Sequence, residues 1–211
     1  MTAFAAGEQV GARVEVSNPF QRFGGVCGVL AGVGTLGYAI AFILLANVLL
    51  SSLALLATGL LGTVVLVALY ERVRGTDASF ALWALVLGLA GALGAALHGG
   101  FDLAGALHPY AIADPNAPSA IDPRGLLTFG ASGIGLGVLA WLIVRGNDLP
   151  RGVGYLGYLV AALQIFLYLG RLIVLDATSP VIVVPALLAG FIVTPIWYAW
   201  LGVSLFRGAR P

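Results

Sequence analysis

The sequence contains no lysine, and it has few charged residues of any kind. Only 9% of its 211 residues are charged, and all ten basic residues are arginine. A soluble domain carries about 25% charged residues, so this chain has too little charge to cover the surface of a soluble fold. The absence of lysine also excludes a retinal Schiff base, because that linkage needs a lysine amine.

Cysteine and histidine are also scarce. The single cysteine, Cys27, excludes an intrachain disulfide and lies in an apolar run, which is typical of a small packed side chain. The two histidines, His98 and His108, fall on one predicted helix at an axial separation of about 15 Å, too far apart to ligate one haem. We therefore expect no cofactor. The net charge of +1, with arginines scattered between apolar runs, excludes a nucleic-acid partner.

Long apolar runs dominate the rest of the sequence. Hydrophobic residues make up 60% of the chain, and the mean hydropathy is +1.03. A transmembrane helix needs about 20 apolar residues to cross a bilayer core of about 30 Å. The run from 23 to 70 has no charge and is roughly twice this length, so it must form two spans, with a break near Asn47 to Ser52.

This pattern predicts an all-α fold, a polytopic membrane helix bundle of six transmembrane helices. The bundle forms one domain over residues 23–207, preceded by a segment, 1–22, that lacks the apolar core of a cleaved signal peptide. The expected spans lie near 24–46, 51–70, 79–107, 126–144, 152–175 and 181–206.

The positions of the arginines predict the orientation of the bundle. With both termini and segment 1–22 in the cytoplasm, the cytoplasmic side holds eight of the ten arginines: Arg13, Arg22, Arg72, Arg74, Arg145, Arg151, Arg207 and Arg210. Cytoplasmic loops of membrane proteins are enriched in arginine and lysine. We therefore expect a multi-pass protein of the cell membrane, with the bilayer as its first partner. Trp197, Tyr198 and Trp200 near the end of the last span predict an aromatic belt at the inner surface.

Small residues recur at helical spacing in two of the spans. Gly91, Ala95 and Gly99 line one face of the third span, and Gly133 and Gly137 form a related pair in the fourth. Small side chains let membrane helices approach one another closely. We expect these stripes to pack helices within one bundle rather than to form a dimer face.

Three longer stretches carry a resemblance. They read HGGFDLAGALHP over 98–109, IDPRGLLTFG over 121–130 and TPIWYAWLGVSLFR over 194–207. With these stretches the chain resembles an uncharacterised family of small bacterial six-span integral membrane proteins. The resemblance implies the six-span architecture and a bacterial inner membrane, and it implies no particular chemistry.

A few polar residues interrupt the third and fifth spans. His98 and Asp102 are four residues apart on the third span, and Gln164, Tyr168 and Arg171 are spaced four and three apart on the fifth. Such spacings place each set on one helix face. Because helices rise about 1.5 Å per residue, Asp102 and Arg171 reach similar depths in the outer half of the membrane. We predict an ion pair between them, supported by the other three side chains.

This predicted cluster has structural and chemical interpretations. An intramembrane ion pair is most often a clamp that fixes helix register, less often a ligand site and least often catalytic. A zinc site takes about four ligands, of which His98 and Asp102 supply two, so any metal would need loop residues such as Asp114 or Asp122. A nucleophile such as Ser132 beside His98 would define a hydrolase.

The leading hypothesis is a non-enzymatic membrane protein with an outward-facing polar pocket. The pocket would bind a small or lipid-like ligand or a membrane partner, through the residues His98, Asp102, Gln164, Tyr168 and Arg171. The alternatives are an intramembrane hydrolase, with or without a metal, and a small transporter or channel that works as a homo-oligomer. The sequence does not predict which residue, if any, is catalytic.

Overall fold

The computed structural model describes residues 19–108 and 124–208, and over these ranges the chain is helical with no strand. Six helices are long and apolar enough to cross a membrane, which confirms the predicted all-α, six-span fold. In chain order, the spans are α1 (Pro19–Ala39) continued by η1 (Ile40–Leu44), α2 (Val48–Val73), α3 (Ala78–Leu107), η2 (Leu126–Ala131) continued by α5 (Ser132–Arg145), α6 (Arg151–Val174), and α7 (Pro180–Leu188) continued by η3 (Ala189–Val193) and α8 (Thr194–Gly208).

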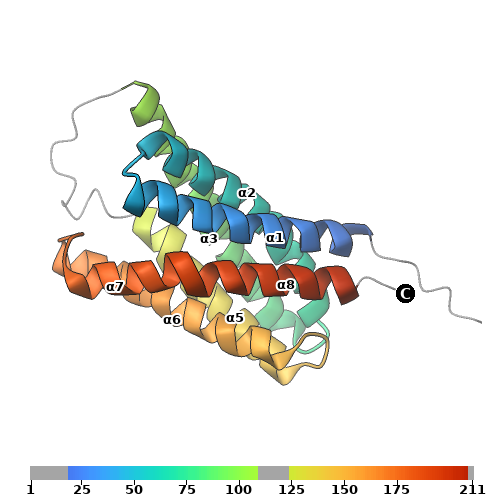
Figure 1. The fold of residues 1–211 in the computed structure, drawn as a ribbon. Helices are drawn as coiled ribbons and strands as arrows, with labels where there is room; N and C mark the ends of the chain where they lie inside the picture. Colours follow the sequence, from blue (N-terminus) through green and yellow to red (C-terminus); the bar gives the residue numbers. More distant parts are fainter. Residues whose placement is uncertain (1–18, 109–123, 209–211) are drawn as a thin grey trace, which may run out of the picture.

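The six spans form a ring in which each packs against the next one in the chain. The ring closes where α8 packs against both α1 and α6 (Figure 1). Helices α1 and α8 are antiparallel, so Pro19 and Gly208 lie at the same end of the bundle (Figure 1). We call this end the Pro19 end, and the opposite end, where the fourth span begins, the Arg124 end.

Glycine brings the first and last spans into backbone contact. A Cβ atom placed on Gly28 would lie 2.7 Å from the Cα atom of Gly202, closer than real Cβ contacts come. Gly25 and Gly32 meet α8 in the same way, one turn before and one turn after Gly28. The ring is therefore closed by a glycine seam, in which the glycine face of α1 packs against the backbone of α8 around Gly202, and small residues of this kind favour close approach of membrane helices.

The predicted small-residue stripe of α3 packs inside the bundle against two different helices. Gly91 faces Ser132 on α5, whereas Gly99 faces Leu56 on α2, and a Cβ atom at either glycine would come within 2.5 Å of that neighbour. Gly133 similarly faces the backbone of α6. Small side chains thus set the spacing of neighbouring spans.

An apolar core fills the half of the bundle nearest the Pro19 end. Its fully buried side chains include Leu69, Leu139, Leu142, Ile143, Val153, Leu201 and Leu205. Trp197 is also in this core, only 2% exposed, and its Nε1 donates a hydrogen bond of 3.1 Å to the carbonyl of Val153 on α6. The prediction that Trp197 belongs to an interfacial belt is therefore wrong. Trp200, one turn further on, is 42% exposed.

Capping residues fix where the spans begin. Asn47 accepts a 3.0 Å hydrogen bond from the amide of Leu50 at the start of α2, at the break that the sequence predicts. Asp77 caps α3 by accepting bonds of 3.1 Å from the amides of Ser79 and Phe80. Side-chain oxygens of this kind satisfy amides that have no partner in the first turn of a helix.

The last span crosses as one continuous helical segment although it contains two prolines. Between Pro185 and Pro195 lies η3, a short stretch of wider π-helical turn. Proline has no amide proton and crowds the carbonyl of the preceding turn, and a π-type turn is a common local adjustment in such helices. The prolines thus shape the helix without breaking it.

Candidate functional site

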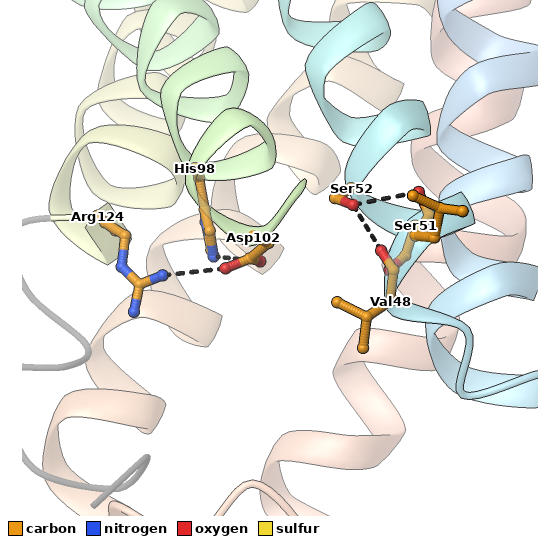
Figure 2. A network of polar contacts seen from close by, with 7 residues as sticks. Val48, Ser51, Ser52, His98, Asp102 and Arg124 are labelled. Carbon is orange, nitrogen blue, oxygen red and sulfur yellow. Dashed lines mark hydrogen bonds and ion pairs between the residues drawn. The ribbon is translucent and has the colours of Figure 1, made fainter. Parts of the chain in front are cut away.

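Three ionisable side chains meet near the Arg124 end of the bundle. Nε2 of His98 lies 3.4 Å from Oδ2 of Asp102, one turn further along α3. Nη1 of Arg124, just before η2, donates a hydrogen bond of 3.2 Å to the other carboxylate oxygen, Oδ1. Figure 2 shows the three side chains pointing toward one another. We call His98, Asp102 and Arg124 the α3 polar cluster.

The arginine that bonds Asp102 differs from the one that the sequence analysis predicts. We predicted Arg171 from its depth on the fifth span, whereas the structure has Arg124 from the start of the fourth. Spans three and four follow each other in the chain and pack antiparallel, with Gly91 facing Ser132. The same antiparallel alignment of the two spans, continued toward the Arg124 end, places Asp102 beside Arg124. The depth of Asp102 in the membrane does not show which neighbouring helix supplies its arginine partner.

The α3 polar cluster is partly open. The exposed fractions of the side chains are 23% for His98, 35% for Asp102 and 32% for Arg124. The guanidinium of Arg124 also lies over the ring of Phe101, 4.7 Å from its centroid, in a cation–π contact. Arg124 is thus held by a carboxylate and by an aromatic face while it stays accessible.

Two polar atoms beside the cluster have unused hydrogen-bonding capacity. Within the described part of the chain, neither Nδ1 of His98 nor Oγ1 of Thr128 has a hydrogen-bond partner, although both atoms are buried. Thr128 lies in η2 next to Gly94, and Gly94 precedes His98 by about one turn of α3. Buried polar atoms are nearly always bonded in native proteins, so two unbonded atoms beside the α3 polar cluster are an unusual feature of this end of the bundle.

The other three predicted site residues lie on α6, which also packs against η2. The ring of Tyr168 lies against Gly130 of η2. Oε1 of Gln164 is buried and, among the described residues, has no hydrogen-bond partner. The structure thus brings His98 and Asp102 together with Arg124, and places Gln164, Tyr168 and Arg171 around η2.

Asp176, just beyond the end of α6, is a carboxylate close to Arg171. Its Oδ1 accepts hydrogen bonds of 2.8 Å from both the amide and the hydroxyl of Thr178. These bonds lower the pKa of Asp176, and the charge of Arg171 lowers it further. The charges of Asp176 and Arg171 therefore interact just beyond the end of α6.

Further polar residues of α1 and α2 lie at the same end of the bundle as the α3 polar cluster. Tyr38 of α1 lies close enough to Asp102 to experience its charge, and its ring stacks on Phe42 with centroids 5.5 Å apart. Ser51 and Ser52 of α2 bond the carbonyl of Val48 at 3.1 and 2.6 Å (Figure 2). The two serines are adjacent polar residues at the start of a span, a signal that the sequence analysis used only to locate the helix break.

The described residues offer little for metal or nucleophilic chemistry. Among them, no group of three or more His, Cys, Asp or Glu side chains is placed to hold a metal ion. The loop candidates Asp114 and Asp122 lie outside the described residues. Ser132 packs against Gly91, and His98 lies seven positions further along α3, about two helical turns away. Ser132 is therefore not beside His98.

Together, the six apolar spans and the half-buried polar cluster define a multi-pass membrane protein with a polar site at one end of its helix bundle. Comparison of the chain with models of known protein families, with characterised proteins and with solved structures gives no match.

Proposed function

We propose that this protein is a non-enzymatic integral membrane protein that binds a small or lipid-like ligand at the α3 polar cluster. The observation that carries the proposal is the position of this cluster. It is a partly open group of ionisable side chains at one end of a bundle whose other half is packed with apolar side chains.

The energetics favour a ligand site over a purely structural clamp. Charged side chains within a membrane span are costly and usually mark function. A clamp is most stable when it is dry and every polar atom is bonded. Here the side chains are 23 to 35% exposed, and Nδ1 of His98 is buried without a hydrogen-bond partner among the described residues.

The cluster suits a ligand with an acidic or hydrogen-bonding head group. Arg124 would recognise the acidic group, and Asp102 would be its partner in the empty site. His98 would add a donor or acceptor through its buried Nδ1. Gln164, Tyr168 and Arg171 would complete the pocket from α6.

Two further features support binding rather than transport, and an outward-facing site. Between the α3 polar cluster and the Pro19 end, the bundle is closed by fully buried apolar side chains, among them Leu69, Leu139 and Leu201. A transport path would need polar groups through this half.

At the Pro19 end lie six described arginines, Arg22, Arg72, Arg74, Arg145, Arg151 and Arg207. By the positive-inside rule this end would face the cytoplasm.

Ligand retention tests the proposal. Wild-type protein, Asp102→Asn and Arg124→Gln would be purified from membranes in a mild detergent, and bound lipids and small molecules quantified by mass spectrometry. We expect the wild type to retain one compound that both variants retain about tenfold less, which corresponds to roughly 1.4 kcal/mol of binding free energy.

Thr63→Val is the matched control for these variants. Thr63 is a polar span residue whose hydroxyl bonds only its own helix, at 2.7 Å from the carbonyl of Leu60, and the control should retain the compound. Identical profiles in all four proteins would show that the α3 polar cluster is structural.

A further inference from the structure

A second group of residues, at the Pro19 end, combines aromatic rings with one cation. Phe80 of α3 packs edge-on against Trp83 and Trp141, with ring centroids 6.4 and 5.2 Å apart. The guanidinium of Arg145, the last residue of α5, lies over the ring of Trp141 at 5.1 Å from its centroid. We call these four residues the Arg145 cluster. It lies at the opposite end of the bundle from the α3 polar cluster.

Arg145 has no carboxylate partner among the described residues, although acidic residues are present at this end. Glu71 pairs with Arg74 at 3.1 Å. Asp77 is engaged as the cap of α3. Asp148 lines a small crevice on the side of Arg72. The charge of Arg145 is therefore held in place by Trp141 and is exposed, with no counter-ion in ranges 19–108 and 124–208.

The surface beside the Arg145 cluster is apolar and open. Phe80 and Trp83 are 46% and 49% exposed, and further along the same two spans Val86 and Ile134 are 57% and 46% exposed. A molecule that places an anionic group on Arg145 would lie with its remainder along this surface. Such a molecule needs both an anionic head and an apolar tail.

We propose that the Arg145 cluster is a binding site for the head group of an anionic phospholipid. The phosphate accepts hydrogen bonds from the guanidinium of Arg145, a geometry to which arginine is well suited. Trp141 orients the guanidinium, and the rings of Phe80 and Trp83 lie beside the start of the acyl chains, where aromatic residues of membrane proteins are enriched. This site is independent of the proposed ligand site.

The test compares lipid retention between two charge-matched variants. Full-length protein in detergent micelles would be mixed with phosphatidylglycerol or with phosphatidylcholine of the same acyl chains, and bound lipid counted by native mass spectrometry. We expect the wild type to prefer phosphatidylglycerol, and Arg145→Gln to lose this preference about tenfold. Arg74→Gln removes the same charge at the same end from a residue that is already paired, and should keep the preference.

Two further measurements separate a lipid site from general attraction of anions. Trp141→Leu should weaken the preference while leaving the charge in place, because Arg145 loses the ring that orients it. Millimolar inorganic phosphate should not displace phosphatidylglycerol, because it lacks the tail. Equal losses in Arg145→Gln and Arg74→Gln, or efficient displacement by phosphate, would overturn the proposal.

Discussion

Asp102 accepts a hydrogen bond from Arg124 at 3.2 Å, although the two residues are 22 positions apart in the sequence. The bond joins the end of the third span to the start of the fourth. Because each partner also contacts a neighbour, Asp102 through His98 and Arg124 through Phe101, the bond links four side chains.

Exchanging the two charges tests this pairing. Asp102→Arg and Arg124→Asp should each destabilise the protein by about 1 to 2 kcal/mol, a modest value because both side chains are about one third exposed. The double variant should recover most of the loss. Thermal unfolding in detergent would measure this, with the pair Asp102→Arg and Arg171→Asp as the comparison. Better recovery with Arg171 than with Arg124 would restore the pairing that the sequence predicts.

The glycine seam between α1 and α8 predicts a strong effect of one methyl group. Gly28→Ala should cost roughly 1 to 3 kcal/mol, because the new Cβ atom would overlap the backbone of Gly202. Gly37→Ala is the control on the same span, because a Cβ atom there meets nothing within 4 Å. Unfolding measurements on both variants would separate packing at the seam from helix propensity. Equal stability of the two would contradict the seam.

The buried indole of Trp197 predicts a second position-specific effect. Trp197→Phe removes the donor to the carbonyl of Val153 and leaves that carbonyl unpaired in an apolar core. We expect a loss of about 1 to 3 kcal/mol. Trp200→Phe, at a position that is 42% exposed, should change the stability little. If both substitutions had the same small effect, the hydrogen bond would contribute nothing measurable.

Metal content tests the hydrolase alternative. The described residues at the α3 polar cluster supply two metal ligands, His98 and Asp102, fewer than a zinc site needs. We therefore expect elemental analysis of purified wild-type protein to find no stoichiometric zinc, and no difference in His98→Ala. Zinc at one equivalent in the wild type, and lost in the variant, would make a membrane metallohydrolase the working model.

The sequence predicted the spans well because hydropathy and length depend on local composition alone. Both the break at Asn47 and the six apolar runs correspond to helices and caps in the structure. Helix α1 begins earlier than the predicted span, at Pro19, and Gln21 in its first turn donates to the carbonyl of Ala68 at 2.9 Å. Such a bond between helices leaves no trace in a hydropathy profile.

The site was predicted only in part because it depends on which helices are neighbours. His98 and Asp102 lie on one face of α3, as their spacing of four residues predicts. Arg124 was overlooked as the partner because it stands at the edge of a span, although consecutive spans usually pack together. Trp197 was misplaced for a related reason: the sequence gives the distance of a residue from the end of a helix, but not the side that faces the protein.

The closure of the ring has a consequence for how the protein is made. Helix α1 is synthesised before α8, and its glycine face, including Gly28, has its partner on α8. Until then this face contacts lipid or insertion machinery. A chain that stops before α8 would therefore leave the glycine face of α1 without its helix partner.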